Sequence, residues 1–298
     1  MIGNHKDGFR SAFVAVIGRP NVGKSTLINR LLGQELSIVS PKPQTTRNRI
    51  SAIVNYPDAQ IIFHDTPGLH DSTNTLNISL ITAAKKTATD SDIILFLVPP
   101  NTIIANEDLA LLDFVSKCKK PVIVAINKMD LMSKAQIRSI IQSFSRMGLS
   151  GNVLAVSALT GEGTESLVEK ILSFAQEGIQ FYPEDYMSDL PEKFFVAEFI
   201  REQIIRLTSQ EVPYKSAVIV EKFVESGDRV TIHADIHVER DSQKRILIGH
   251  GGSMIKNIGT AARQKIEAFL DCSVRLELYV KVSPKWTNSS SKVREFGY

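Results

Sequence analysis

The first 180 residues alternate short apolar runs with longer stretches in which apolar residues recur at helical spacing. The apolar runs are continuous, as is typical of strands covered on both faces by helices. This pattern predicts an α/β domain over residues 1–180, with a mostly parallel sheet and helices on both faces. The expected strands are 12–17, 48–56, 61–64, 93–98, 122–126 and 153–156, and the expected helices are 24–32, 79–87, 107–118, 135–147 and 165–175.

Beyond residue 192 the order of elements changes to helix, two strands, helix, glycine turn, helix and strand, which predicts a separate α+β domain over 193–298. Ser226-Gly227-Asp228 is a good hairpin turn between the paired strands 216–224 and 229–238. Residues 181–192 form the predicted linker, and its aromatic residues distinguish it from a purely flexible tether. The tail 285–292 is low in complexity.

Length and composition fit two domains of an ordinary globular protein. The 298 residues exceed what one typical core needs. No apolar run approaches the roughly 20 residues of a membrane-spanning helix, and residues 1–10 lack the apolar core of a signal peptide. Two widely separated cysteines suit a reducing cytoplasm better than a disulfide framework.

Charge is distributed unevenly in the second half of the chain. Residues 181–239 carry 6 basic and 12 acidic side chains, whereas residues 240–298 carry 11 basic and 5 acidic ones. A basic region beside an acidic one suggests an anionic partner, although two differently charged solvated faces would give the same count.

Residues 18–25, Gly-Arg-Pro-Asn-Val-Gly-Lys-Ser, match the phosphate-binding loop of nucleotide-binding proteins. The loop follows a predicted strand and opens a predicted helix, so its backbone N–H groups can wrap a β-phosphate at the positive end of that helix. The Lys24 ammonium would bind the β- and γ-phosphates, and the Ser25 hydroxyl would bind Mg²⁺. The candidate phosphate-binding residues are Gly18, Asn21, Val22, Gly23, Lys24, Ser25 and Thr26.

The segment Asn127-Lys128-Met129-Asp130 indicates that the nucleoside is guanosine. The Asp130 carboxylate can accept hydrogen bonds from guanine N1–H and the 2-amino group, and adenine offers neither donor. Asn127 would tie this loop to the phosphate loop, while the Lys128 stem would pack along the base. Ser157 and Ala158 end the next strand, where a backbone amide can reach guanine O6.

Asp65-Thr66-Pro67-Gly68 closes the second continuous strand. Asp65 is placed to hold Mg²⁺ through water, and the Gly68 amide can reach a γ-phosphate. In the polar loop before strand 48–56, Thr46 is the first choice to complete the Mg²⁺ shell and Thr45 the second. The full switch segment is Gln44, Thr45, Thr46 and Arg47, and the expected metal ligands are Ser25, Thr46 and Asp65.

No catalytic residue is evident in the sequence. Many GTPases orient the attacking water with a glutamine directly after Asp-Thr-Pro-Gly, but Leu69 stands there and cannot hydrogen-bond to water. Hydrolysis must therefore use another group or another ion, or be slow. The Asn21 amide is a candidate ligand for a monovalent cation such as K⁺ between the phosphates.

Taken together, these motifs resemble the translation-factor-related GTPases that carry an apolar residue after Asp-Thr-Pro-Gly. Residues 10–282 resemble the Era family, the bacterial GTPases of 30S ribosome assembly. The resemblance rests on Gly-Arg-Pro-Asn-Val-Gly-Lys-Ser-Thr, Pro-Gln-Thr-Thr-Arg and Asp-Thr-Pro-Gly-Leu-His, and on Tyr-Pro-Glu-Asp-Tyr and Glu-Val-Pro-Tyr, which lie outside any nucleotide site. It implies GTP or GDP and Mg²⁺ as ligands, and RNA near the 3′ end of 16S rRNA as a partner.

In the second domain, the Gly-x-x-Gly turn of residues 249–252 fits a type II KH domain, which binds single-stranded RNA. Relatives usually place a lysine within this turn, whereas this chain has His250 and Gly251, so other cations must attract the phosphates. Trp286, the only tryptophan, could stack on a base or pack against its own domain. The candidate RNA-binding residues are Gly249, His250, Gly251, Gly252, Lys244, Arg245, Lys256 and Arg263.

Three functions remain open from the sequence. The leading one is a cytoplasmic, monomeric enzyme whose GTP hydrolysis switches its affinity for immature 30S subunits. The second is an RNA-binding module that senses GTP with little turnover, as Leu69 allows. The third is a signalling GTPase of the cell cycle, in peripheral contact with the inner face of the cell membrane. No lipidation motif or basic amphipathic helix supports this third function.

Overall fold

The computed structural model describes residues 8–42, 45–68, 75–101, 104–149 and 151–298. The chain forms two compact units, residues 1–72 with 80–189 and residues 73–79 with 190–298. Among the described residues no helix has the length and apolarity that crossing a bilayer requires.

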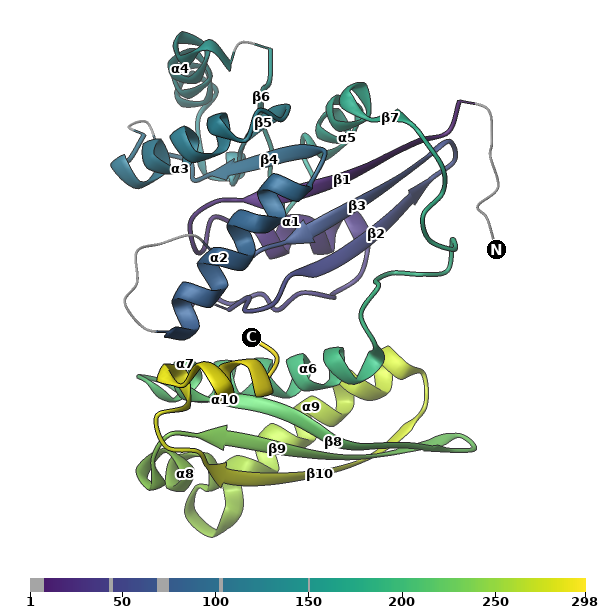
Figure 1. Ribbon diagram of the computed structural model, residues 1–298, viewed down its shortest axis with the longest axis vertical. Coiled ribbons are helices and arrows are strands. Elements are labelled where there is room, and N and C mark those ends of the chain that lie inside the picture. Colours follow the sequence, from purple (N-terminus) through teal and green to yellow (C-terminus); the bar gives the residue numbers. More distant parts are fainter. Residues whose placement is uncertain (1–7, 43–44, 69–74, 102–103, 150) are drawn as a thin grey trace. The chain divides into compact units, whose positions relative to one another are not determined.

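The first unit is built on a seven-stranded sheet with the order β2-β3-β1-β4-β5-β6, and β7 pairs with the start of β1 (Figure 1). The strand pairs from β3 to β6 are parallel, and β2 runs antiparallel to β3. The predicted mostly parallel sheet is therefore confirmed. The strands are β1 Arg10–Ile17, β2 Ile50–Tyr56, β3 Ala59–Asp65, β4 Ile93–Val98, β5 Val122–Ile126, β6 Val153–Ala155 and β7 Gln176–Glu177.

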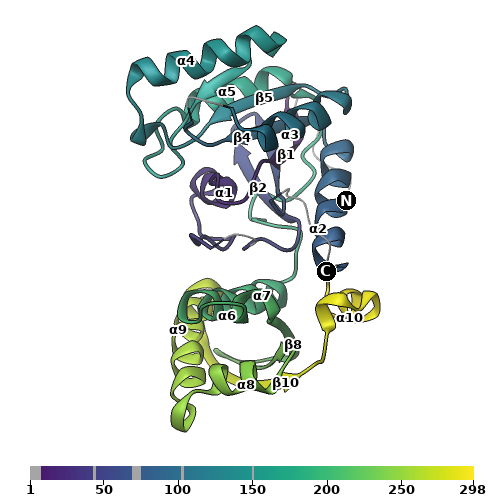
Figure 2. The ribbon, with the colours of Figure 1, turned by 90° about the vertical axis from the view of Figure 1, so that its left-hand side faces the viewer.

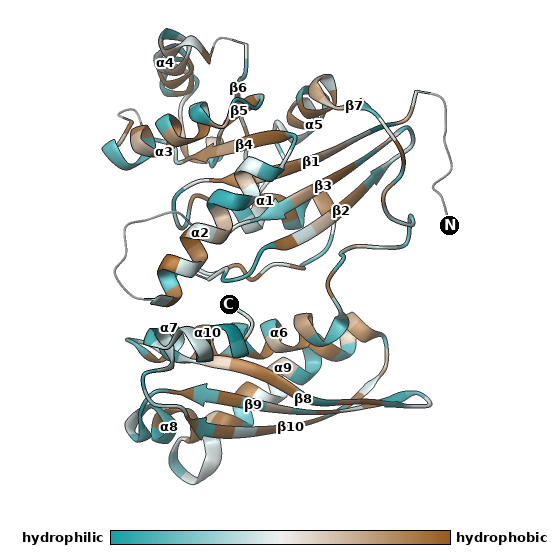
Figure 3. Cartoon of the chain, viewed as in Figure 1, coloured by the Kyte–Doolittle hydropathy of each residue, from teal (hydrophilic) through white to brown (hydrophobic). Residues whose placement is uncertain are grey.

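Helices cover both faces of this sheet, and Figure 2 shows α1 and α2 on opposite sides of it. Every residue of β4 is buried, as its continuous apolar run predicts, and the strands form the brown interior of Figure 3. Local signals set the helix ends: Ser133 and Gln136 form a capping box at the start of α4, and Gly33 ends α1 with φ of 76°. The helices are α1 Lys24–Leu32, α2 Thr75–Asp90 (of which residues 75–79 belong to the second unit), α3 Asn106–Lys117, α4 Lys134–Phe144 and α5 Thr164–Phe174.

The carboxyl ends of the parallel strands bring the candidate nucleotide residues to one edge of the sheet. The phosphate loop runs from the end of β1 to the start of α1, and Asp65 ends β3. The Asn127 segment follows β5, and Ser157 follows β6. In open α/β sheets this edge is where ligands bind.

Residues 181–187 lie along β2 and β3 as a strap. The side chain of Gln60 on β3 is fully buried, and its Oε1 accepts hydrogen bonds from the Phe181 and Tyr182 amides at 2.9 and 3.0 Å. Its Nε2 donates to the Tyr182 carbonyl at 2.9 Å. Further along, the Ile53 amide on β2 donates to the Met187 carbonyl at 2.9 Å. The Tyr-Pro-Glu-Asp-Tyr segment is thus held to the first unit by hydrogen bonds between its backbone and the Gln60 and Asn55 side chains.

The second unit has a three-stranded sheet with the order β10-β9-β8, in which β8 and β9 are antiparallel and β9 and β10 are parallel. Alternate residues of β9 from Val230 to Val238 are buried, as expected where helices cover one face. The strands are β8 Ala217–Ser226, β9 Arg229–Val238 and β10 Ser273–Val282, and the helices are α6 Glu192–Leu207, α7 Val212–Lys215, α8 Asp241–Ile248, α9 Ser253–Leu270 and α10 Ser290–Glu295.

The C-terminal segment is more ordered than its composition suggests, because the stretch 285–292 contains a 3-10 turn at Trp286–Asn288 and the start of α10 at Ser290. Trp286 is fully buried, its indole N–H donates to the Lys215 carbonyl at 2.9 Å, and its ring lies 5.3 Å from that of Phe296. Of the two roles considered for Trp286, the structure therefore supports packing within its own domain.

Candidate nucleotide site and nucleic-acid turn

The phosphate loop is closed on itself by Lys24. The Lys24 Nζ donates to the carbonyls of Gly18 and Arg19 at 3.0 and 2.9 Å. Two glycines are needed for close approach, since a Cβ at Gly18 would lie 2.5 Å from the Leu97 carbonyl oxygen and one at Gly23 would lie 2.2 Å from Asn127 Nδ2. The loop therefore packs directly on the ends of neighbouring strands.

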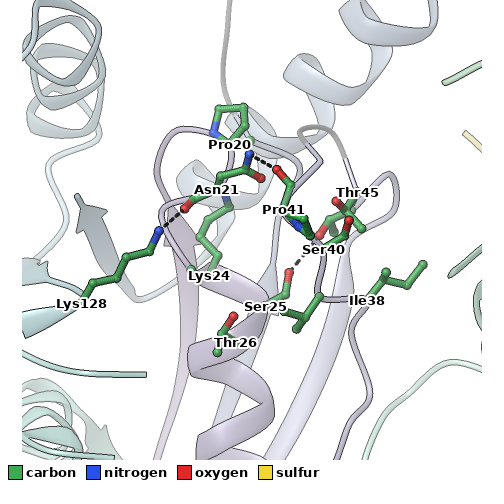
Figure 4. A pocket seen from close by; sticks show the side chains of 14 residues that line it. Pro20, Asn21, Lys24, Ser25, Thr26, Ile38, Ser40, Pro41, Thr45 and Lys128 are labelled. Carbon is green, nitrogen blue, oxygen red and sulfur yellow. Dashed lines mark hydrogen bonds between the residues drawn. The ribbon is translucent and has the colours of Figure 1, made fainter. Parts of the chain in front are cut away.

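A cavity of about 360 Å³ opens between the phosphate loop and the segment before β2 (Figure 4). This volume is within the range of small-molecule sites. Thr26 lines it, as do Gly68, Lys128, Thr45 and Thr46. The cavity therefore collects residues from the phosphate loop, the switch segment, the segment after β3 and the Asn127–Asp130 segment, but not Ser157 or Ala158.

Three oxygen atoms gather at the position expected for Mg²⁺. The Ser25 hydroxyl donates to Asp65 Oδ2 at 2.8 Å and lies 3.1 Å from Thr46 Oγ1, which is itself 3.4 Å from Asp65 Oδ2. Hydroxyl and carboxylate oxygens are the ligands that Mg²⁺ prefers, so this donor set fits the ion. The Thr45 hydroxyl instead donates to the Lys42 carbonyl, which leaves Thr46 as the threonine of the cluster.

Two charged residues at the expected Mg²⁺ position, Lys24 and Asp65, are buried. Burial lowers the pKa of Lys24 to about 8, against the opposing effect of the Asp65 carboxylate. Burial likewise raises the pKa of Asp65, while Lys24 and the Ser25 and Thr46 hydroxyls act in the opposite direction. A buried lysine that lines the cavity is suited to phosphate, and a buried carboxylate beside the Ser25 hydroxyl is suited to a cation.

The guanine segment is joined to the phosphate loop as expected. Asn127 Nδ2 donates to the Val22 carbonyl at 2.8 Å, and Lys128 Nζ donates to the Asn21 carbonyl at 3.0 Å. Lys128 adopts a left-handed conformation with φ of 64°. Asp130 is exposed, and its Oδ1 accepts a hydrogen bond from the Ser157 hydroxyl at 2.6 Å. One carboxylate oxygen is thereby oriented before any base binds.

The loop after β6 shows contacts that sequence patterns did not predict. The Ala158 amide, expected at guanine O6, donates to Asn127 Oδ1 at 2.9 Å. Arg30 on α1 donates to the carbonyls of both Ala158 and Leu159, with a distance of 3.3 Å to the first. Arg30 and Ala158 are 128 residues apart, and no motif signals such a pairing.

Asn21, the candidate cation ligand, uses its amide nitrogen to reach the segment before β2. Its Nδ2 donates to the Pro41 carbonyl at 2.8 Å (Figure 4), and its own φ is 62°. Arg47 in the switch segment is buried. Gln44 and Leu69 lie outside the described residues.

In the second unit, the Gly-x-x-Gly turn joins α8 to α9 as predicted. Gly249, Gly251 and Gly252 have φ of 74°, 57° and 81°, conformations that favour glycine. His250 and Gly251 are exposed. A Cβ at Gly252 would meet no atom within 4 Å, so the backbone there is open to a ligand.

The cations around this turn differ in their partners. Arg263 donates to both carboxylate oxygens of Glu267, at 2.8 and 2.9 Å. Over the described parts of the chain, no ion pair involves Lys244, Arg245 or Lys256. These three residues are therefore the stronger candidates for binding phosphate groups.

Known proteins match both units. Residues 13–128 match the family model described as "50S ribosome-binding GTPase", and residues 211–287 match the KH domain. The chain is 47% identical over 291 residues to the GTPase Era of Geotalea uraniireducens, covering 97% of this chain and 98% of that protein. It is 43% identical over 293 residues to GTPase Era of Synechocystis, covering 98% and 93%.

Two solved structures are similar over nearly the whole chain. One is Era in complex with MgGDPNP and nucleotides 1506–1542 of 16S ribosomal RNA, with a TM-score of 0.93, 38% identity, and coverage of 97% of this chain and 99% of that one. The other is a variant of Aquifex aeolicus Era bound to GDP and AlF₄⁻, with a TM-score of 0.94, 38% identity and the same coverage.

Proposed function

The chain belongs to the Era family of GTPases, and we propose on this basis that it uses GTP hydrolysis to control its binding of 16S rRNA during assembly of the small ribosomal subunit. The main support for this proposal is that one chain combines a guanine-nucleotide site in its first unit with an open Gly-x-x-Gly turn in its second. The similar Era structure contains a GTP analogue with Mg²⁺ and RNA from 16S rRNA.

In this function the first unit binds GTP at the edge of its sheet. The loop amides from Gly18 to Thr26 and the Lys24 ammonium hold the phosphates. Ser25, Thr46 and Asp65, which lie together, hold Mg²⁺, the last through water. When bound, this ion neutralises charge on the β- and γ-phosphates.

Guanine is selected by the Asp130 carboxylate, which Ser157 orients. Asn127 and Lys128 fasten the base-binding segment to the phosphate loop through Val22 and Asn21. Loss of the γ-phosphate removes a contact of Gly68 and Thr46, and both residues belong to segments that can rearrange on hydrolysis.

A monovalent cation assists hydrolysis in this proposal. The Leu69 side chain has no hydrogen-bonding group, and carbonyl-type oxygens such as the Asn21 amide oxygen are suitable K⁺ ligands. Turnover should rise when K⁺ replaces Na⁺, and the difference should disappear in Asn21→Ala. Equal rates in the two ions would contradict the role of the cation without affecting GTP binding.

The second unit binds single-stranded RNA at residues 249–252. Glycines allow sugar and phosphate to approach the backbone, and Lys244, Arg245 and Lys256 supply positive charge. We expect the protein to act as a monomer in the cytoplasm, where small subunits assemble; contact with the inner face of the membrane would be secondary.

The test is an anisotropy titration of single-stranded RNA from the 16S 3′ end at two salt concentrations. Gly252→Asp adds a negative charge where phosphate approaches and should weaken binding on the order of tenfold to a hundredfold. Gly227→Asp is the matched control, because Gly227 also has positive φ and open space but lies in the β8–β9 turn. Lys256→Ala should weaken binding and flatten its salt dependence.

GTP binding should be unchanged in all three variants. If Gly252→Asp binds this RNA as tightly as Gly227→Asp, residues 249–252 are only a connection between helices, and the proposed RNA site is wrong.

A further inference from the structure

Asp108 is a buried carboxylate in the first turn of α3 that has no part in the nucleotide chemistry described above. Only 2% of the residue is exposed, and its Oδ1 accepts a hydrogen bond from Arg19 Nε at 2.8 Å. The adjacent Glu107 lies 3.9 Å from Arg19 Nη1, but its side chain is 71% exposed. Because a buried charge requires a partner, the Asp108 contact is the stronger of the two.

Arg19 belongs to the phosphate loop, and its backbone contacts the groups that hold phosphate. Its carbonyl accepts a hydrogen bond from Lys24 Nζ at 2.9 Å. The next residue, Pro20, packs against Gly68, where a Cβ would lie 2.7 Å from the Pro20 nitrogen. A shift of the Arg19 backbone would therefore move both Lys24 and the segment expected to contact the γ-phosphate.

Side chains from distant parts of the first unit hold both halves of the phosphate loop. Asn127 after β5 holds the Val22 carbonyl, at the second half of the loop. Asp108 holds the Arg19 guanidinium, at the first half. Asn127 belongs to a recognised motif. Asp108 belongs to none, and it lies 89 residues from Arg19 in the sequence.

We propose that Asp108 is a positioning residue for the β-phosphate: by fixing Arg19 on α3, it holds the loop amides and Lys24 in the geometry that wraps this phosphate. The anchor acts on a preformed loop, so its loss widens the range of loop conformations without removing a direct ligand contact. The inference rests on the phosphate-binding role proposed for residues 18–25.

The experiment compares GDP with GMP, which lacks the β-phosphate, by calorimetry on the full chain at constant Mg²⁺. Asp108→Asn keeps the side-chain shape and removes the charge, and Asp108→Ala removes both. Affinity for GDP should fall on the order of tenfold to a hundredfold, with the larger loss in Asp108→Ala, as for other residues that orient a ligand-binding group. Affinity for GMP should stay within about twofold, since the base-binding segment is anchored by Asn127 and Ser157.

Two further variants separate positioning from general stability. Glu107→Gln removes the neighbouring exposed acid and should leave the GDP-to-GMP affinity ratio unchanged. In an Arg19→Ala background, Asp108→Ala should cause no additional loss of this ratio, because the two residues act as one unit. Thermal unfolding of every variant establishes that it is folded.

Folded Asp108 variants with the wild-type GDP-to-GMP ratio would overturn the inference. Equal losses for GDP and GMP would also overturn it, because they would indicate damage to the whole site. A wild-type protein that does not prefer GDP to GMP would instead contradict the proposed phosphate role of residues 18–25.

Discussion

Gly23 shows how much a single backbone position constrains the site. Its φ is 99°, and a Cβ there would lie only 2.2 Å from the Asn127 amide nitrogen. The same amide connects the guanine segment to the phosphate loop. Side-chain size at Gly23 therefore controls a contact between two motifs that lie more than a hundred residues apart in the sequence.

Gly23→Ala should disrupt this contact as well as strain the backbone. Positive φ costs an alanine about 1–2 kcal/mol, and displacement of Asn127 should weaken GTP binding at least tenfold. Gly33→Ala is the matched control: φ there is 76°, but a Cβ would meet no atom within 4 Å. It should lower the free energy of unfolding similarly and leave GTP affinity unchanged. Denaturant unfolding and nucleotide titration measure the two effects, and equal GTP affinities in the two variants would contradict the assignment.

Asp130 is the residue on which the choice of base depends. Asp130→Asn replaces one acceptor by a donor facing the guanine 2-amino group, so GTP should bind roughly tenfold to a hundredfold more weakly. Xanthosine triphosphate, which carries an oxygen at that position, should be favoured instead. Calorimetry with both nucleotides tests this, and an unchanged GTP affinity would show that another group reads the base.

At the scale of elements, the sequence predicted the strands and helices well because their signals are local. Continuous apolar runs marked β1, β3, β4 and β5, and a capping box starts α4. Elements with weak local signals were missed, including the two-residue strand β7 and the helix α10. The nucleotide motifs were visible because their spacing is short, whereas the contacts of Arg30 and Asp108 depend on how distant segments pack.

Helix α6 carries a buried ion pair that the sequence did not indicate. Arg201 Nη2 lies 2.6 Å from Glu198 Oε2, and the two side chains are 1% and 5% exposed. Pairs three residues apart on a helix usually lie in solvent, where they contribute little to stability. Here both side chains are buried, so each charge relies on the other for the stabilisation that water gives to exposed charges.

Arg201→Met should destabilise the second unit by about 3–5 kcal/mol, because it leaves the Glu198 carboxylate buried without its partner. The double change Glu198→Leu with Arg201→Met should recover much of this loss, since both charges are removed. Arg275→Met, which breaks a pair whose arginine is 68% exposed, should cost less than about 1 kcal/mol. Chemical denaturation of the three variants provides the measurement. A double variant less stable than Arg201→Met would contradict this account.

At the scale of the whole molecule, the strap of residues 181–187 determines which part of the predicted linker belongs to the first unit. The domain boundaries 1–180, 181–192 and 193–298 remain a proposal. Gln60 holds the strap with three hydrogen bonds, two of which come from backbone amides that have no other acceptor in the described structure. The Tyr-Pro-Glu-Asp-Tyr motif thus acquires a structural role.

Gln60→Ala should release the strap locally. Hydrogen exchange of the Phe181 and Tyr182 amides should accelerate on the order of tenfold, which corresponds to the loss of one typical hydrogen bond per amide. Gln180→Ala is the control, because Gln180 donates only to the Tyr182 carbonyl and both amides keep their acceptor. The exchange rates are measured by mass spectrometry. Equal rates in the two variants would show that packing, and not Gln60, protects these amides.

The strap also shortens the linker between the first unit and α6 of the second. Its last hydrogen bond is made by Met187 and α6 begins at Glu192, so residues 188–191 lie between the strap and α6. Four extended residues span no more than about 14 Å. For an RNA that contacts both units, a short connection of this kind makes the second contact an intramolecular step once the first has formed.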